Sequence, residues 1–257
     1  MIFYFSATGN CKHVASEISK VTGERMISIT ECMENGEFTF SVDNTESGEM
    51  FGLVVPTYAW GLPTIVCDFL KRLEIRWREI PYAYFVATYG TTPGQTGYFA
   101  EQYVKEKGIS FQARFSIKMP DTWTPVFDLS DPDKVGGINQ DADLQIRNMI
   151  LAIADREKGD FMQRKVPLIL AKALYAMGYP MLRRTGKFQV KDTCIGCGLC
   201  EKKCPVNAIQ MENKRPVWVC KECVMCLGCL HHCPEFAIQY GKNTSKHGQY
   251  THPAVKI

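Results

Sequence analysis

Two short runs of cysteines near the end of the chain limit its folding options more than any other feature. The runs cover residues 194–205 and 223–234, and both have the spacing C-x2-C-x2-C-x3-C-P. They hold eight of the twelve cysteines in a chain of 257 residues. Disulfide scaffolds are short and secreted, and residues 1–10, MIFYFSATGN, lack the features of a secretory signal. The runs therefore indicate metal or iron–sulfur ligation.

The spacing inside each run is typical of iron–sulfur ligation rather than of zinc binding. Three cysteines this close together reach three irons of one cubane, and the fourth, held by a Cys-Pro step, points to a partner cluster. Zinc sites use pairs of C-x-x-C instead. Each run is followed by a short apolar piece, AIQM after the first and AIQY after the second. This internal repeat predicts a pseudo-twofold pair of half-domains.

Residues 187–240 resemble a bacterial two-cluster ferredoxin. The resemblance implies that one cluster is bound by Cys194, Cys197, Cys200 and Cys233. It implies that the other is bound by Cys204, Cys223, Cys226 and Cys229. A run that began at Cys220 would place its fourth ligand on Leu230, so we expect Cys220 not to be a ligand. His231 and His232 lie between ligands, and we expect them to have packing or exposed roles.

The first 120 residues alternate between apolar stretches and stretches with helical spacing. Apolar runs of this length are typical of buried strands, and strands that alternate with helices of roughly 10–15 residues indicate a parallel sheet. Helices then cover both faces of that sheet. The sequence thus predicts an α/β fold with a doubly wound five-stranded parallel sheet. The predicted strands cover residues 1–5, 25–30, 50–58, 82–90 and 111–119.

The first predicted strand leads directly into a polar loop at residues 6–11 and then into a helix. Backbone N–H groups and the helix dipole favour an anion at such a helix start. The loop matches neither the P-loop nor the dinucleotide motif. Loops after the third and fourth strands would converge at the same edge of the sheet, so together the three loops predict a site for a planar ring with a phosphate. The candidate cofactor-binding residues are Ser6, Ala7, Thr8, Gly9, Asn10, Cys11, Thr57, Tyr58, Ala59, Trp60, Gly61, Thr88, Tyr89 and Gly90.

Residues 1–150 resemble flavodoxin. The phosphate loop of that family reads T/S-x-T-G-x-T/S, and Ser6, Thr8 and Gly9 match it. Cys11 stands where the family has a hydroxyl residue, and a thiol is a weaker hydrogen-bond donor. The resemblance implies that the site binds FMN. It also implies that the ring stacks on Tyr58 or Trp60 and on Tyr89.

These patterns predict a chain in three parts. A flavodoxin-like FMN-binding domain covers residues 1–160, a basic helical connector covers 161–186, and a smaller α+β ferredoxin domain covers 187–257. Lys and Arg number 15 against 22 Asp and Glu in residues 1–160, but five against none in 161–185 and ten against five in 186–257. We therefore expect the two halves to attract each other. If their docking is mobile, electron transfer between them should slow as salt rises.

The whole chain resembles the flavodoxin–ferredoxin fusions of anaerobic bacteria and archaea. This implies an electron carrier that passes electrons between two [4Fe–4S] clusters and a non-covalent FMN, and so links one- and two-electron chemistry. One alternative is a flavin-dependent reductase of a small substrate, with residues 120–140 as its lid and Asp121, Trp123 and Asp128 as candidate lid residues. Another is a cluster-dependent sensor or interaction module.

The expected partners follow from charge and hydropathy. No region is basic enough to favour nucleic-acid binding, and no apolar stretch has the roughly 18–20 residues of a membrane span. The resemblance to the fusions implies a redox protein as electron donor or acceptor, and we expect a cytoplasmic location. The basic segment 161–185 is expected to be a connector with a solvated basic face, with binding to a membrane interface as the alternative.

Overall fold

The computed structural model describes residues 1–42, 49–77 and 81–257. The first part of the chain forms a parallel sheet of six strands in the order β2-β1-β4-β6-β7-β8, which confirms the predicted α/β class. The prediction of five strands is one too few. The additional strand has only two residues, and Gly159 and Asp160 offer no apolar run by which to recognise it. The strands are β1 (Ile2–Tyr4), β2 (Met26–Ser28), β4 (Phe51–Pro56), β6 (Ala83–Tyr89), β7 (Ala113–Lys118) and β8 (Gly159–Asp160).

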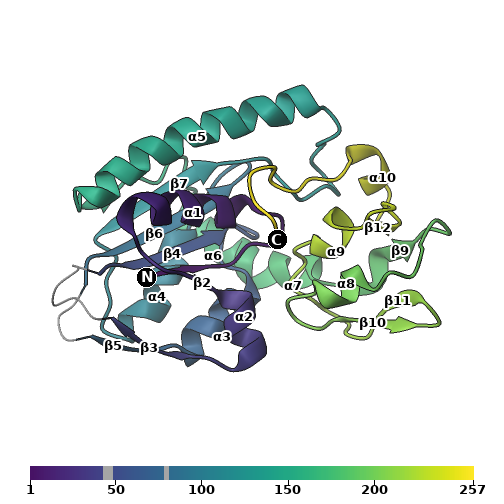
Figure 1. Ribbon diagram of the computed structural model, residues 1–257, viewed down its shortest axis with the longest axis horizontal. Helices are drawn as coiled ribbons and strands as arrows, with labels where there is room; N and C mark the ends of the chain where they lie inside the picture. Colours follow the sequence, from purple (N-terminus) through teal and green to yellow (C-terminus); the bar gives the residue numbers. More distant parts are fainter. Residues whose placement is uncertain (43–48, 78–80) are drawn as a thin grey trace.

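Helices cover both faces of the sheet (Figure 1). On one face lie α1 (Asn10–Thr22) and α5 (Pro132–Ala154). On the other lie α2 (Ile29–Asn35), α3 (Thr64–Arg72) and α4 (Thr96–Lys105). The side chain of Asp131 caps α5 by accepting hydrogen bonds from two backbone N–H groups of its first turn.

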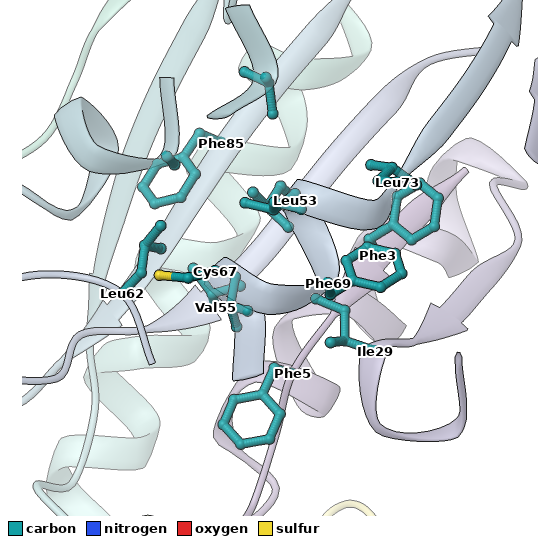
Figure 2. Packing of buried hydrophobic residues seen from close by; sticks show 14 of the residues in the cluster. Phe3, Phe5, Ile29, Leu53, Val55, Leu62, Cys67, Phe69, Leu73 and Phe85 are labelled. Carbon is teal, nitrogen blue, oxygen red and sulfur yellow. The ribbon is translucent and has the colours of Figure 1, made fainter. Parts of the chain in front are cut away.

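The alternation of side chains along the strands builds one core on each face. Phe3, Leu53 and Phe85 belong to the cluster under α2, α3 and α4. Figure 2 shows these residues close together with Phe69 and Leu73 of the adjoining helical segment. The intervening strand residues pack under α1 and α5 instead, so the central strands β1, β4 and β6 are apolar at nearly every position. A two-stranded parallel sheet of β3 (Thr39–Val42) and β5 (Glu74–Trp77) accompanies the main sheet.

One almost continuous helix joins the two parts of the chain. It consists of α6 (Leu168–Ala173), a π-helical segment (Leu174–Gly178) and α7 (Tyr179–Leu182). The hydroxyl of Tyr175 donates to the carbonyl of Leu62, at 2.6 Å. The hydroxyl of Tyr179 donates to the carbonyl of Val224, at 3.1 Å. This helix therefore contacts both the sheet and the cysteine-rich part of the chain. A 3-10 turn (Thr185–Lys187) follows it.

The cysteine-rich part is built from two short antiparallel pairs and three short helices. Strand β9 (Phe188–Val190) pairs with β12 (Ile238–Tyr240), and β10 (Ile209–Glu212) pairs with β11 (Arg215–Trp218). The helices are α8 (Leu199–Lys202), α9 (Gly228–His231) and α10 (Thr244–His247). Each cysteine run contains one short helix and leads into one strand, β10 or β12, as the internal repeat predicts.

The two parts are packed against each other rather than loosely docked. Val224, between two cysteines of the second run, is buried within the apolar cluster of the sheet. The ring of His231 donates to the carbonyl of Thr122. The last segment of the chain then runs back toward α1 (Figure 1), where the N–H of His252 donates to the carbonyl of Thr8, at 2.7 Å. Buried apolar contacts and several hydrogen bonds therefore hold the parts together, and the Lys12 ammonium adds an exposed contact to the carbonyl of Lys256.

Candidate functional site

A cavity of about 280 Å³ lies beyond the carboxyl ends of the parallel strands. The loops after β1, β4 and β6 form three of its walls, which is where ligands bind in open parallel sheets. Its volume is near the lower end of the roughly 300–1,000 Å³ found for small-molecule sites. The predicted cofactor-binding residues that line it are Ser6, Ala7, Thr8, Asn10, Cys11, Thr57, Tyr58, Ala59, Trp60, Thr88, Tyr89 and Gly90.

Gly9 and Gly61 are not among the described residues that line the cavity, and each gives room to another part of the chain. Gly9 has a φ of +104° at the start of α1, and a Cβ there would lie 2.6 Å from Cβ of His252. A Cβ on Gly61 would lie 2.5 Å from the ring of Tyr175 in the connector. Both glycines thus let distant segments close around the loops that carry the site.

The turn at residues 58–61 is tight and strained. Ala59 and Trp60 both have positive φ values, of 47° and 65°, which is uncommon for residues other than glycine. Backbone hydrogen bonds in both directions between Tyr58 and Gly61 close the turn. Strained backbone of this kind persists where the surrounding structure fixes it, often at ligand sites. Here the turn brings Tyr58, Ala59 and Trp60 into one wall of the cavity.

Cys11 makes a specific contact inside the loop at residues 6–11. Its Sγ lies 3.1 Å from Oγ1 of Thr88, at the end of β6. Burial raises the pKa of this thiol to about 12, so it stays protonated at neutral pH. The thiol therefore links the start of α1 to the third loop of the site.

Several cavity residues come from segments outside the three predicted loops. Asp121 and Trp123, both candidates for a lid, line the cavity together with Thr122 and Phe127. Asp128 is absent from the described lining, and its carboxylate accepts a hydrogen bond from the N–H of Ser130. Sequence reasoning missed Tyr179, Leu182 and Met225, which also line the cavity. No local pattern marks these three, because they approach the loops only through the packing of the connector and of the cysteine-rich part.

Asp121 is the one carboxylate in the described wall of the cavity. Its Oδ1 accepts a hydrogen bond from the N–H of Trp123, at 3.1 Å. Its side chain fills the space that a Cβ on Gly90 would need. Burial raises the pKa of Asp121 from 3.8 to about 6, against the opposing effect of that hydrogen bond. This wall therefore carries a group that changes its charge in mildly acidic solution.

The eight cysteines of the two runs gather around two small cavities of about 20 Å³ each. One cavity is lined by Cys194, Cys197, Cys200 and Cys233, which we call the outer set. The other is lined by Cys204, Cys223, Cys226 and Cys229, which we call the inner set. Each set combines three cysteines of one run with the fourth of the other.

The donor chemistry of both sets fits an iron–sulfur cubane. Within the described parts of the chain, no three Cys, His, Asp or Glu side chains converge on one point as a single metal ion requires. A cubane instead takes each thiolate on a different iron, so its ligands surround a void. All twelve cysteines are free thiols, and burial raises the pKa of Cys226 to about 12. A bound cationic cluster would overcome this preference, because metal coordination deprotonates a thiol.

Backbone N–H groups donate to sulfur in both sets. The N–H of Ala208 lies 3.2 Å from Sγ of Cys204, and the N–H of Ala237 lies 3.3 Å from Sγ of Cys233. Hydrogen bonds to sulfur help to set the reduction potential of an iron–sulfur centre. The structure therefore provides electrostatic support for thiolates as well as the thiolates themselves.

The other candidate ligands of this region lie elsewhere. Cys220 is exposed and lines neither cysteine cavity. His231 donates through Nε2 to Thr122 and accepts the N–H of Tyr250 at Nδ1, which defines its neutral tautomer. His232 donates through Nε2 to the carbonyl of Ala7. Both imidazoles thus join parts of the chain by hydrogen bonds.

Cys226 connects the two kinds of cavity. It belongs to the inner set and also lines the cavity at the strand ends, where the neighbouring Met225 lies as well. No cysteine of the outer set reaches the described wall of the strand-end cavity. The inner set is therefore adjacent to the cavity, and the outer set is farther away.

The fold and the paired sites define an electron-transfer flavoprotein with an iron–sulfur domain. A family model for the flavodoxin domain matches residues 1–145, and a model for the 4Fe-4S binding domain matches residues 189–210. Because the first match spans more than half of the chain, the protein belongs to the flavodoxin domain family. The second match covers the first cysteine run. Both agree with the resemblances stated from the sequence.

Two solved structures resemble this chain only distantly. One is the rubredoxin oxygen:oxidoreductase of the anaerobe Desulfovibrio gigas, with 14% identity and a TM-score of 0.32, covering 60% of this chain and 36% of that one. Another is the Trp repressor binding protein of Bacillus subtilis, with 13% identity and a TM-score of 0.31, covering 57% of this chain and 96% of that one. The chain thus spans about a third of the first protein. No curated protein matches it. Among the described residues, no helix is long and apolar enough to cross a bilayer.

Proposed function

We propose that the protein carries electrons between two [4Fe–4S] clusters and a non-covalent FMN. The observation that carries this proposal is the position of Cys226, which lines both the inner cysteine cavity and the cavity at the strand ends. A cluster on the inner set would lie beside a flavin in that cavity. Electron tunnelling weakens steeply with distance, so this adjacency favours direct transfer between the two cofactors.

The cavity offers the groups that FMN needs. The loop at residues 6–11 precedes α1, so backbone N–H groups and the helix dipole support a phosphate there. Tyr58, Trp60 and Tyr89 line the cavity and supply aromatic surface for the ring. When bound, the flavin takes up one or two electrons while each cluster exchanges one, and this difference lets the protein link the two kinds of chemistry.

The positions of the cysteine sets support an order of electron flow. Cys197 of the outer set is exposed, as is the neighbouring Ile195. We infer that a redox partner exchanges electrons with the outer cluster, that the inner cluster relays them, and that the flavin is the third centre. We also propose that residues 1–160 form the FMN-binding domain, residues 161–186 the connector and residues 187–257 the ferredoxin domain. The free state of all twelve cysteines supports a reducing, cytoplasmic location.

Anaerobic reconstitution tests the cofactor content. We expect eight irons, eight acid-labile sulfides and one acid-extractable FMN per chain. Cys220→Ser should leave these counts unchanged, because Cys220 lies outside both sets. Cys229→Ser should lose or convert one cluster. Saturation at one cluster, or recovery of FAD without FMN, contradicts the proposal, and so does a flavin that dithionite reduces without exchange with the clusters.

A second candidate function is a flavin-dependent reductase of a small substrate. The observation that favours it is the wall formed by Asp121, Trp123 and Phe127, which adds a titratable group and aromatic surface to the cavity. The test is oxidation of the fully reduced protein by a panel of quinones and enones. Saturable oxidation that Asp121→Asn abolishes, with electron exchange between flavin and clusters retained, would favour the reductase. Uniformly unsaturable oxidation favours the carrier.

A further inference from the structure

The connector helix exposes a row of large apolar side chains. Ile169 is 86% exposed, Met177 is 68% exposed and Met181 is 65% exposed. We call this surface the connector stripe; its members are Ile169, Leu170, Met177, Met181 and Leu182. The opposite side of the same helix is anchored, because Ala171 and Tyr179 are buried. The stripe is therefore the unpartnered face of a fixed element.

The π-helical segment keeps the stripe on one face. Ile169, Met177 and Met181 are separated by eight and four residues. In an α-helix of 3.6 residues per turn, such spacings drift around the axis. The π-helical segment at Leu174–Gly178 has more residues per turn, so it returns Met177 and Met181 toward the line of Ile169. The π-helical segment thus helps to bring these three side chains onto one face of the connector helix.

Basic residues flank the stripe along the chain, and we call Arg164, Lys172 and Arg184 the basic rim. Residues 161–185 contain five Lys and Arg and no Asp or Glu. Lys165 pairs with Asp160 and Arg183 pairs with Glu222. Arg164, Lys172 and Arg184 make no ion pair within the described parts of the chain, and the Lys172 ammonium lies over the ring of Tyr98. An apolar centre with a basic rim is complementary to an apolar surface with an acidic rim.

One end of the stripe reaches the strand-end cavity. Leu182 belongs to the stripe and also lines that cavity, and so does Tyr179 on the same turn. A partner that covers the stripe would therefore rest beside the proposed flavin. A lipid surface would match the apolar face and the basic rim as well, but contact with the redox cavity favours an occupant that exchanges electrons.

We propose that the connector stripe is the docking site of an acidic redox protein that exchanges electrons with the flavin. This inference rests on the proposed function, because it requires FMN in the cavity. An apolar contact over Met177 and Met181 supplies the centre of the interface, and the basic rim steers the acidic partner toward it. The outer cysteine set is then a second, separate site of electron exchange with a partner.

Stopped-flow electron exchange with the cofactor-loaded protein tests the proposal. The probes are a small ferredoxin of strongly negative net charge and a cytochrome of strongly positive net charge. At low salt we expect faster flavin exchange with the acidic probe. The double variant Met177→Glu with Met181→Glu should slow this exchange about tenfold, because it places like charge in the contact. Replacing Arg164, Lys172 and Arg184 by Gln should slow it and flatten its salt dependence.

The matched control is Leu144→Glu with Leu151→Glu on α5. These two residues are 56% and 64% exposed, so they resemble the stripe in exposure but lie on a different helix. The control should leave the exchange rate unchanged, and all variants should retain FMN and iron. Equal rates for stripe and control variants overturn the proposal. The proposal is also overturned if the stripe variants exchange electrons with the acidic probe at the normal rate but lose binding to phosphatidylglycerol vesicles. Loss of self-association at a normal exchange rate overturns it as well.

The experiment separates failure of this surface from failure of the proposed function. Dithionite needs no docking site, so it should reduce flavin and clusters in every variant. If the unaltered protein binds no FMN, or if its flavin and clusters exchange no electrons after dithionite treatment, the proposed function itself is wrong. If the protein binds FMN and its flavin and clusters exchange electrons, but the stripe variants leave the rate of exchange with the acidic probe unchanged, the docking site alone is wrong.

Discussion

The ring of His232 donates a hydrogen bond from Nε2 to the carbonyl oxygen of Ala7, at 2.9 Å. Ala7 lies in the loop between β1 and α1, and His232 directly precedes a cysteine of the outer set. The bond therefore ties the loop proposed to hold phosphate to a loop proposed to hold iron. Because it is neutral and partly buried, salt does little to weaken it, and this bears on how the two parts of the chain exchange electrons.

We predict that electron transfer between flavin and clusters is independent of salt. The charges of the two parts differ in sign by sequence, but Val224 is buried in the core of the sheet and neutral hydrogen bonds join the parts. Flash-reduction rates should agree within about twofold between 0.05 and 1 M salt, since only exposed charges are screened. A steep decrease in rate would show a mobile interface and would restore the expectation drawn from charge alone.

Asp121→Asn should make stability less dependent on pH. The pKa of Asp121 is raised to about 6, so its contribution to stability is present below about pH 4 and is lost as pH rises through 6. The free energy of unfolding of the variant, relative to the unaltered protein, should therefore rise by about 1–2 kcal/mol from pH 4 to 7, allowing for partial exposure. Urea midpoints at each pH measure this. A constant difference would mean that Asp121 is solvated in the folded state.

Gly9→Ala should abolish FMN binding. Gly9 has a φ of +104°, and the added Cβ would meet the backbone and side chain of His252. The matched control is Gly23→Ala at the end of α1, where φ is +72° but no atom lies within 4 Å. It should lose about 1 kcal/mol of stability from backbone strain and still bind FMN. Titration followed by flavin fluorescence compares the two, and equal affinities would refute a special role for the space at Gly9.

Cys11→Ser should bind FMN at least as tightly as the unaltered protein. A serine hydroxyl keeps the contact with Thr88 and is a better donor than the thiol. Cys11→Ala removes the contact and leaves the Thr88 hydroxyl without this partner, which should cost about 1–2 kcal/mol of stability. The measurements are FMN dissociation constants and urea midpoints. A weaker site in the serine variant would show that the thiol itself contributes to binding.

Local motifs explain why much of this architecture could be predicted. The cysteine sets follow from spacing within two runs, and the structure gathers the same eight residues around two cavities. The three strand-end loops follow from apolar runs that stop at polar turns, because parallel strands end at one edge of a sheet. In both cases the chemistry and its position are encoded within a few consecutive residues.

The remaining features depend on contacts between distant segments. Strand β8 has two residues and is defined by its pairing with β7. Tyr179 and Met225 enter the cavity only after the connector and the cysteine-rich part have packed onto the sheet. The packed contact between the sheet and the cysteine-rich part could not be predicted for the same reason. The sequence gives the charges of each part, but the burial of Val224 depends on how the two parts pack.

The double position of Cys226 also affects how the protein is assembled. A cluster on the inner set would fix the segment from Met225 to Cys226, which forms part of the wall of the strand-end cavity. Through thermodynamic linkage, each cofactor then stabilises the other by the same free energy. Flavin should therefore leave more readily from protein that lacks iron, and iron should resist chelators better in protein that holds flavin. Because the two sites share this segment, molecules that hold both flavin and clusters would be favoured over molecules that hold one kind of cofactor alone.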